Sequence, residues 1–386
     1  MYKHLRLFCS SASKVPRRNL NDYLRRTILD PSHGLTSDEK QLQDLAKNFA
    51  VNEFRPHRQE WDSKEIFPVE TLRKAAALGF GGLYIPTEHC GTGLSRLETS
   101  IVIEALSQGC VSTAAYISIH NMVVGMISQF GNDDQRSKYI PDLVSMNRFG
   151  SYCLTEPDSG SDAASLKSTA VRKGDYYVLN GSKAFISGSG NDNIYLIMCR
   201  TGASGPKGIS CLIVDGDVTG LSLGKKEKKL GWNSHPARII TLEDVKVPAT
   251  NLLGSEGFGF NIAMLGLNGG RTNIASCSLG GAQWAIEETI EYTTTRKQFG
   301  QYIADFQNTQ FKLADMASEI FAIRLVVRAA AKEIDIEKDY DDLSHQKVSA
   351  ASAAAAAKLL ATEKCFTIID NCLQVMLHHY VVTLLI

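Results

Sequence analysis

The chain has 386 residues, 44% of them hydrophobic and 21% charged, and its formal net charge at pH 7 is zero. A single hydrophobic core usually stops growing at about 250–300 residues, so this length favours more than one domain. The composition excludes a disordered or collagen-like chain. No segment reaches the roughly 18 consecutive apolar residues that a membrane span needs.

Charge is unevenly distributed along the sequence. The first 26 residues hold seven basic side chains and one acidic side chain, Asp22, which gives this segment a net charge of +6. A basic, serine-containing, acid-poor start is typical of a mitochondrial transit peptide, which we place at residues 1–30. A solvated basic arm is the alternative. The rest of the chain carries −6, which argues against the basic footprint of a nucleic-acid-binding protein.

Cysteine spacing gives no sign of a metal site. The nine cysteines lie singly, without a C-x-x-C pair and without the His and Cys spacing of a zinc site. We therefore expect buried thiols in a reducing compartment and no metal.

Residues 31–150 are predicted to form an N-terminal α-helical domain. Thr36 and Glu39 have the spacing of a capping box, and apolar residues recur at helical spacing after them. Further helices are expected at residues 69–78, 96–109 and 120–131, each followed or ended by a glycine.

Residues 151–257 are predicted to form a central antiparallel β-barrel or sheet. Asn180-Gly181 between apolar runs is a strong signal for a hairpin turn, and residues 173–175 break an earlier run. Strands are also expected at residues 193–200, 208–215 and 237–247. Since no helices separate these strands, a doubly wound parallel sheet is not expected.

Helical sequence returns at Phe258, so residues 258–386 are predicted to form a C-terminal helical bundle. A loop is expected over residues 333–347, which are rich in acidic side chains, before an alanine-rich helix. The predicted fold class is therefore α+β and multidomain.

Two common nucleotide-binding patterns are missing, and one hydrolase pattern occurs. Neither G-x-G-x-x-G nor the P-loop pattern is found. Residues 220–224 fit G-x-S-x-G, with Ser222 as the candidate nucleophile. That pattern requires a strand before it and a helix after it, and the sequence after Gly224 has no apolar helical face. A serine in an ordinary strand is the favoured interpretation.

Two other stretches could together bind a cofactor. YCLTEPDSGSDAAS, residues 152–165, offers hydroxyls and loop N–H groups that could hold a polyphosphate. NGSKAFISGSG, residues 180–190, offers Phe185 and Ser187 to a planar ring. Taken singly, the first also fits a polar turn between domains and the second a strand core.

Together these stretches resemble the flavin signature of the acyl-CoA dehydrogenase family, Y-C-x-T-E-P-x-S-G-S-D followed by N-G-x-K-x-[WF]-I-[ST]. The resemblance covers nearly the whole chain after the transit segment, and stretches such as AAYISIHNM and GKKEKKLGWNS resemble members that act on short branched acyl groups. It implies FAD as cofactor, an acyl-CoA substrate, electron-transfer flavoprotein as electron acceptor, a homotetramer and the mitochondrial matrix.

The resemblance also implies which residues contact the two ligands. For FAD they are Tyr152, Cys153, Leu154, Thr155, Glu156, Ser159, Gly160, Ser161, Phe185, Ile186, Ser187 and Gln374. The FAD of a neighbouring subunit would be reached by Arg296, Phe306 and Gln307, with a helix-end cation as the alternative role of Arg296. For acyl-CoA they are Ser161, Asn268, Gly269, Gly270 and Arg271.

The implied reaction needs a carboxylate to take the proton from Cα of the thioester. In most family members this base is a glutamate in an E-G-[ST] stretch beyond Gln374, and in a few it stands at the position of Gly270. Here Gln374 is followed by VMLHHYVVTLLI, so neither position holds a carboxylate. We therefore expect a C-terminal bundle that is truncated or divergent after Gln374, and impaired catalysis. A non-catalytic flavin- or acyl-CoA-binding subunit of the same fold is the alternative.

One position inside the signature departs from the family pattern. Asp158 stands where glycine is usual. Aspartate tolerates turn conformations, but it brings a negative charge near the expected pyrophosphate, so we expect reduced flavin affinity.

Overall fold

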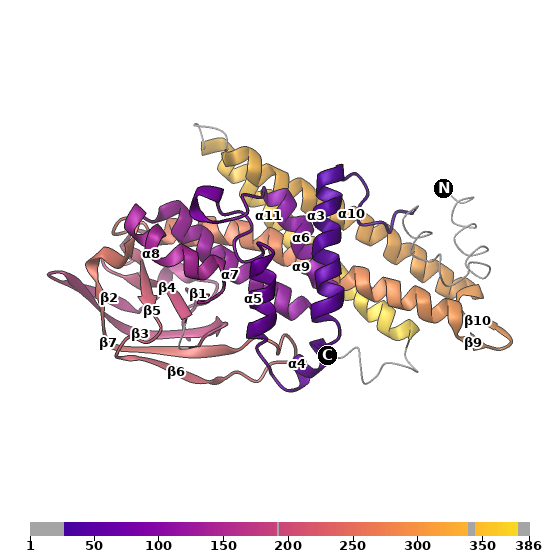
Figure 1. Cartoon of the computed structure of the whole chain (residues 1–386), viewed down its shortest axis with the longest axis horizontal. Coiled ribbons are helices and arrows are strands. Elements are labelled where there is room, and N and C mark those ends of the chain that lie inside the picture. Colours follow the sequence, from indigo (N-terminus) through magenta and orange to yellow (C-terminus); the bar gives the residue numbers. More distant parts are fainter. Residues whose placement is uncertain (1–26, 191–192, 339–343, 377–386) are drawn as a thin grey trace. The chain divides into compact units, whose positions relative to one another are not determined.

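The computed structural model describes residues 27–190, 193–338 and 344–376 (Figure 1). The chain divides into two compact units, each built from segments that are not consecutive in sequence. The helical unit comprises residues 1–59, 100–111 and 271–386, and the sheet unit comprises residues 60–99 and 112–270. The predicted transit peptide lies outside the described residues, apart from its last four positions.

The longer helices are α3 (Ser37–Phe49), α4 (Arg58–Ser63), α5 (Val69–Ala77), α6 (Arg96–Ser107), α7 (Val111–Phe130), α8 (Asp133–Val144), α9 (Gly259–Thr295), α10 (Gln307–Lys338) and α11 (Ser344–Val375). The strands of the main sheet are β1 (Phe149–Cys153), β2 (Thr169–Lys173), β3 (Tyr176–Ser187), β4 (Asn193–Arg200), β5 (Ile209–Asp215), β6 (Leu221–Lys226), β7 (Ala237–Pro248) and β8 (Leu252–Leu253). A small hairpin is formed by β9 (Lys297–Gln298) and β10 (Gln301–Tyr302).

The predicted capping box is confirmed at the start of α3. The Thr36 hydroxyl accepts a hydrogen bond from the Glu39 N–H at 3.3 Å, and the Glu39 carboxylate accepts one from the Thr36 N–H at 2.7 Å. α7 is longer than predicted, because its first half is buried on nearly all sides and includes buried serine and threonine, so it lacks an amphipathic pattern. Within the described part of the chain α7 is the one helix long and apolar enough to cross a membrane, and 83% of its most apolar stretch is buried.

The sheet unit is built on an eight-stranded sheet with the order β6-β7-β3-β2-β4-β5-β8 (Figure 1), and β1 pairs with β4. Most neighbours are antiparallel, while β4 pairs in parallel with both β1 and β2. β4 is buried on both faces, so its residues alternate between two cores. Ile194, Leu196 and Met198 pack into the core that includes α7 and α8. Tyr195, Ile197 and Cys199 pack into the core among the strands.

The prediction of a hairpin turn at Asn180-Gly181 is wrong. β3 runs without a break through both residues, and the turn lies at residues 174–175, between β2 and β3. Asn180 and Gly181 instead mark a register shift against β7, where the Asn180 amide exchanges two hydrogen bonds with Asp244. Gly181 is required because a Cβ there would lie 2.3 Å from the Ser168 hydroxyl. A bulge uses the same residue types as a turn.

The prediction of a loop over all of residues 333–347 is also wrong, because it makes the loop too long. α10 continues to Lys338 and α11 begins at Ser344, so both ends of this acidic stretch are helical. Residues 339–343 lie outside the described residues. Glutamate, lysine and alanine favour helix strongly enough to extend both helices into the polar stretch.

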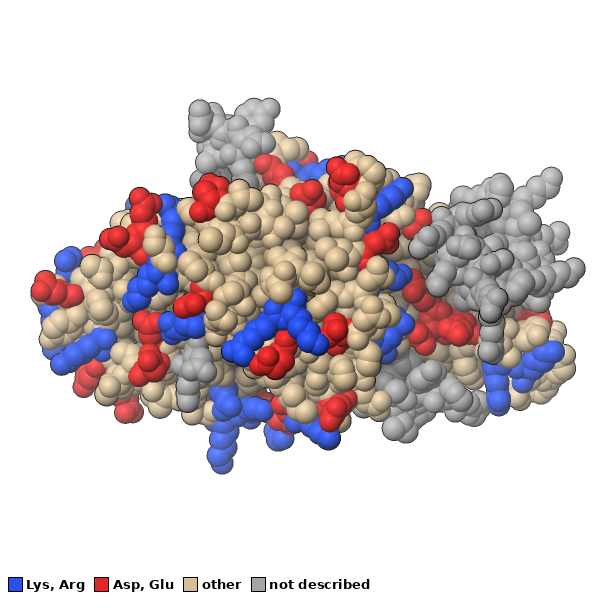
Figure 2. All heavy atoms as spheres, in the orientation of Figure 1, with Lys and Arg blue, Asp and Glu red and all other residues tan. Residues whose placement is uncertain are grey.

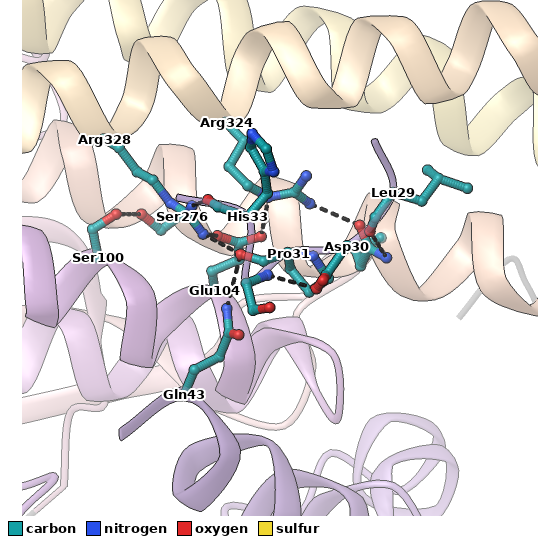
Figure 3. A network of polar contacts seen from close by, with 12 residues as sticks. Leu29, Asp30, Pro31, His33, Gln43, Ser100, Glu104, Ser276, Arg324 and Arg328 are labelled. Atoms are coloured by element: carbon teal, nitrogen blue, oxygen red, sulfur yellow. Dashed lines mark hydrogen bonds and ion pairs between the residues drawn. The ribbon is translucent and has the colours of Figure 1, made fainter. Parts of the chain in front are cut away.

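A buried ion cluster joins the helices of the helical unit (Figure 3). The Arg324 guanidinium donates to Glu104 at 2.8 Å and to the Gln283 side-chain oxygen at 2.7 Å. Arg328 lies 3.6 Å from the other Glu104 oxygen. Glu104 and Arg324 are only 1% and 2% exposed. One carboxylate therefore faces two guanidinium groups in the interior.

The same cluster holds the segment 29–33 against the helical unit. Arg328 donates to the carbonyls of Pro31 and His33, and Gln283 donates to the carbonyl of Leu29 at 3.1 Å (Figure 3). The Leu29 side chain lies in the apolar core formed by α9, α10 and α11. These contacts satisfy carbonyls of a non-helical segment that would otherwise be buried without partners.

The prediction of buried thiols is confirmed for most cysteines of the described residues. Eight cysteines among the described residues are free thiols, and all except Cys90 are buried. No group of three or more metal-ligating side chains occurs in the described ranges. On the face shown in Figure 2, basic and acidic side chains of the described residues are interspersed rather than gathered by sign.

Replacing Glu104 with glutamine is expected to destabilise the helical unit. The change leaves two buried cations without their carboxylate, and breaking a buried ion pair from one side costs about 3–5 kcal/mol. Urea unfolding followed by far-UV circular dichroism measures the loss.

The matched control is Glu319→Gln. Glu319 pairs with Lys364 at 3.1 Å, and their side chains are 37% and 50% exposed. Removing this pair should cost less than about 1 kcal/mol. Equal losses in the two variants would contradict the role given to the buried cluster.

Candidate functional site

A buried ion pair joins the two stretches of the signature. The Lys183 ammonium on β3 lies 2.7 Å from the Glu156 carboxylate, and the two side chains are 0% and 6% exposed. Lys183 also donates to the Leu154 carbonyl at 3.2 Å, and the Ala184 N–H donates to the Thr155 carbonyl at 2.8 Å. The loop after β1 is thus fixed to β3 by side-chain and backbone contacts.

Glu156 holds the far end of the same loop. Its two carboxylate oxygens accept hydrogen bonds from the N–H groups of Lys167 and Ser168 at 2.6 and 3.0 Å. Burial acts to raise the pKa of the Glu156 carboxyl, but Lys183 and these hydrogen bonds act against it, and the net result is a lowered pKa. Glu156 is therefore an ionised structural anchor, and its side chain is already saturated.

Several signature residues face inward and can offer only backbone groups to a ligand. Cys153 is fully buried in the core among the strands, where burial raises the pKa of its thiol. The Ser159 hydroxyl is buried and donates to the Asp162 carbonyl at 2.6 Å. Gly160 and Ser161, by contrast, are exposed, and Thr155 is half-buried. The signature hydroxyls without a hydrogen-bond partner among the described residues include that of Tyr152, which is buried. Those of Thr155 and Ser161 are the more accessible ones.

Asp158 carries less unbalanced charge than its sequence position implies. Its carboxylate lies 3.2 Å from the Lys167 ammonium, and about three quarters of each side chain is exposed. Solvent and the neighbouring cation both screen the charge.

A β-bulge turns Phe185 out of the sheet. The register between β3 and β7 shifts between Lys183 and Ile186. Within this bulge Phe185 has φ +59° and is 66% exposed, whereas Ile186 is 2% exposed and belongs to the core. A positive φ is unfavourable for a bulky aromatic residue, and such strain is concentrated at ligand sites. The bulge presents an exposed aromatic ring at a fixed position.

A cavity of about 330 Å³ lies beside this bulge. Its lining comes from the end of β3 and from the loop between β6 and β7: Phe185, Ser187, Glu227, Lys228, Lys229, Gly231, Trp232, His235 and Ala237. The Ser187 carbonyl accepts a hydrogen bond from Ser151 at 2.9 Å, while its hydroxyl makes no hydrogen bond to another described residue. Two aromatic side chains and the Ser187 hydroxyl fit a planar, polar ligand. The Lys228 ammonium already pairs with the Glu65 carboxylate at 2.6 Å.

Four of the five residues expected to bind the substrate lie on one helix, α9, and the fifth is Ser161. Asn268 and Arg271 are half-buried, as is Gly270 between them. At Gly269 a Cβ would lie 2.6 Å from an Arg96 nitrogen, and at Gly270 the nearest atom would be the Met122 sulfur at 3.5 Å. Arg96 itself stacks on the Tyr84 ring at 3.6 Å. A Cβ at Gly269 would thus press on the Arg96 guanidinium, whereas one at Gly270 would make an ordinary contact.

The remaining predicted residues belong to the helical unit. Arg296 follows α9 and its carbonyl accepts a hydrogen bond from the Ile303 N–H at 3.0 Å, across the β9–β10 hairpin. Phe306 contacts the Phe299 ring edge-on, at a centroid distance of 6.3 Å. Arg296, Gln307 and Gln374 are all exposed. The hairpin thus brings Arg296, Phe306 and Gln307 into one region.

Ser222 does not form a nucleophile elbow. It lies inside β6, and Gly224 of the same pattern is also a β6 residue paired toward β7. A strand-to-helix turn, which would expose the hydroxyl of such a serine, is replaced here by strand followed by loop and strand.

Sequence reasoning overlooked the second wall of the cavity. Lys229, Trp232 and His235 lie in or next to a stretch that carries the family resemblance, but its motif assigns them no contact with a ligand. Lys229 shapes this wall, because its ammonium donates to the carbonyls of Trp232 and His235 at 2.6 and 2.7 Å. The clustering of Trp and His between glycine and proline was the available signal.

Family models match the three parts of the chain. The N-terminal domain of acyl-CoA dehydrogenases matches residues 36–147, the middle domain residues 151–245 and the C-terminal domain residues 257–377.

Similar proteins support the same assignment. The mitochondrial isobutyryl-CoA dehydrogenase of Bos taurus is 54% identical over 90% of this chain and 82% of that protein. Its counterpart in Dictyostelium discoideum is 52% identical over 91% of this chain and 83% of that protein. Butyryl-CoA dehydrogenase from Megasphaera elsdenii superposes with a TM-score of 0.83 at 33% identity, over 89% of this chain and 88% of that chain. PigA with FAD and proline gives 0.83 at 26% identity, with the same shares covered.

The fold and the site thus define a flavin-dependent oxidoreductase. The chain belongs to the acyl-CoA dehydrogenase family, which confirms the family and the fold class predicted from sequence. Its cofactor is FAD, and its class of reaction is the dehydrogenation of an acyl-CoA.

Replacing Lys183 with methionine is expected to loosen the signature loop. The variant leaves the buried Glu156 carboxylate without its cation, at a cost of about 3–5 kcal/mol near pH 7. Urea unfolding of the two proteins measures the difference. The control is Lys167→Met, which removes an exposed pair and should cost less than about 1 kcal/mol.

The effect of Lys183→Met should depend on pH. In the parent chain the pKa of Glu156 is lowered from an ordinary value of 4.5, so its contribution is complete above that value and is lost as the pH falls through the folded pKa. In the variant, burial still acts to raise the pKa of Glu156, but the Lys183 cation no longer opposes it, so the neutral carboxyl is favoured. The stability gap should therefore narrow between about pH 7 and about pH 4. A gap that is constant over this range would contradict the assignment.

Proposed function

We propose that this protein oxidises a short branched acyl-CoA, isobutyryl-CoA to methacrylyl-CoA, in valine catabolism. The observation that carries the proposal is the 54% identity to a mitochondrial isobutyryl-CoA dehydrogenase over 82% of that protein. Identity at this level over 90% of this chain favours a shared substrate as well as a shared fold.

For the cofactor, the residues present fit a bound flavin. Phe185 and Ser187 border a cavity of about 330 Å³ whose second wall carries two lysines and Trp232. We assign Phe185, Ile186 and Ser187 to the ring, and the hydroxyls and N–H groups of Thr155, Gly160 and Ser161 to the pyrophosphate side. FAD, when bound, supplies the acceptor for the hydrogen that leaves Cβ as hydride.

For the substrate, we assign Ser161, Asn268, Gly269, Gly270 and Arg271 to acyl-CoA. The proton on Cα must pass to a carboxylate, and backbone N–H groups must stabilise the charge that develops on the thioester oxygen. Gly270 holds no carboxylate, and no E-G-[ST] stretch follows Gln374 in these 386 residues. We propose that a chain of these residues alone binds FAD and thioester but turns over slowly.

The wider setting follows from the resemblance and from the names of the relatives. We propose electron-transfer flavoprotein as the electron acceptor, a homotetramer in which Arg296, Phe306 and Gln307 reach the FAD of a neighbour, and a place in the mitochondrial matrix. We further propose that residues 31–150, 151–257 and 258–386 act as three domains, preceded by a transit peptide.

The absorption spectrum of the purified chain, recorded without oxygen before and after addition of isobutyryl-CoA, tests the proposal. We expect a flavin band that is perturbed by the thioester but bleaches slowly, because the cofactor and substrate residues are present without a base. The rate of bleaching should be lower by about 10²–10⁴ than for the bovine relative.

Each other outcome changes a particular part of the proposal. Rapid bleaching would mean that a base exists elsewhere, and the impairment would be wrong. A flavin band indifferent to every acyl-CoA would favour a non-catalytic flavin-binding subunit. A purified chain without flavin, even after FAD is supplied, would contradict the cofactor site.

Placing a carboxylate at Gly270 should restore turnover. A Cβ there meets the Met122 sulfur at an ordinary contact distance of 3.5 Å, so a substitution at Gly270 begins without a steric clash. We expect the rate of flavin bleaching in Gly270→Glu to rise by at least about a hundredfold.

The matched control is Gly270→Gln, which has the same size and cannot act as a base. If both variants bleach at the parent rate, the position of Gly270 is not adjacent to Cα. If both rise equally, the gain comes from packing and not from proton transfer.

A further inference from the structure

His235 lies in the wall of the flavin cavity, outside both stretches of the flavin signature. It lines the cavity together with Phe185 and Ser187, which come from the opposite strand segment. His235 is only 3% exposed. The centroid of its ring lies 6.0 Å from the ring centroids of both Trp232 and Tyr116. A polar ring held this tightly beside a ligand cavity has a fixed direction of hydrogen bonding.

One nitrogen of the imidazole is already used inside the protein. Nδ1 lies 3.2 Å from the Ser112 carbonyl oxygen and 3.3 Å from the Ser112 hydroxyl. A carbonyl oxygen can only accept a hydrogen bond, so we assign the ring proton to Nδ1. Nε2 then carries a lone pair, and it makes no hydrogen bond to any other described residue.

The ring stays neutral at physiological pH. Burial lowers the pKa of His235 to about 4, and the nearby Lys229 ammonium acts in the same direction. The Lys229 ammonium itself donates to the carbonyls of Trp232 and His235, so the cation is part of the wall. The wall therefore presents an acceptor, and not a second positive charge, at the position of the imidazole.

We propose that His235 is a flavin-contacting residue whose Nε2 accepts a hydrogen bond from a donor of the bound cofactor, either the ring N3–H or a ribityl hydroxyl. The inference deepens the assignment of this cavity to FAD. Both candidate donors belong to the part of FAD that Phe185 and Ser187 would border, and Nε2 is the imidazole nitrogen that is left to a ligand once Nδ1 bonds to Ser112.

Titration of the apo form of the full chain with FAD, followed by flavin fluorescence, tests the proposal. His235→Phe keeps a planar ring and removes the acceptor, and we expect it to weaken FAD binding about fivefold. His235→Gln keeps a side-chain acceptor and should recover most of the affinity. Thermal unfolding of each apo protein shows whether the folds are equally stable.

His89→Phe is the matched control. The His89 Nδ1 also lies close to a serine hydroxyl, that of Ser128 at 3.1 Å, but His89 does not line the cavity. This variant should bind FAD like the parent chain. N3-methylated FAD separates the two donors: if N3–H is the donor, the parent binds the analogue about fivefold more weakly and His235→Phe shows no further loss. If a ribityl hydroxyl is the donor, the fivefold effect of His235→Phe persists with the analogue.

Three results would overturn the proposal. Parent and His235→Phe could bind FAD equally, or His235→Phe and His235→Gln could be equally weak, which would indicate packing and not hydrogen bonding. A parent chain that binds no FAD would overturn the cavity assignment together with this inference, whereas the first two results leave the cofactor assignment intact.

Discussion

The candidate flavin site depends on the ion pair between Glu156 and Lys183. These two residues are 27 positions apart, and each occupies a specified position of the flavin signature. The loop between β1 and β2 is rich in polar groups and glycine and could not hold one conformation alone. A carboxylate that accepts from Lys183 and from two N–H groups fixes both ends of the loop to β3. The signature is thus partly a structural requirement, and the ligand contacts are built around it.

The bulge in β3 follows from the same anchor. Lys183 must point inward to reach Glu156, and Ile186 must point inward to fill the core among the strands. Strict alternation would place residues three apart on opposite faces of a strand, so one of the two could not be buried. The register shift between them resolves the conflict and leaves Phe185 outside with φ +59°. The exposed aromatic ring beside the cavity is therefore a consequence of two buried neighbours.

The sequence predicted the fold well where one period dominates. The capping box at Thr36 and the strands β4, β5 and β7 lie where pattern alone placed them. It failed at Asn180-Gly181, because a bulge and a hairpin turn demand the same residues and only the partner strand decides between them. The flavin loop was found through its motif, but the roles inside it were not, since pattern cannot show that Ser159 bonds to its own loop. The position of His235 could not be predicted from local pattern, because its hydrogen-bond partner, Ser112, is 123 positions away.

The glycines of α9 show how packing and chemistry can be separated at one helix. Glycine inside a helix costs about 0.5–1 kcal/mol relative to alanine, so each needs a reason. A Cβ at Gly266 would lie 1.8 Å from the end of Met126, and one at Gly269 would lie 2.6 Å from Arg96. These two glycines permit close packing. Gly270 has no such neighbour, because the nearest atom is 3.5 Å away. Packing therefore does not account for Gly270, which agrees with the proposal that acyl-CoA lies beside this part of α9.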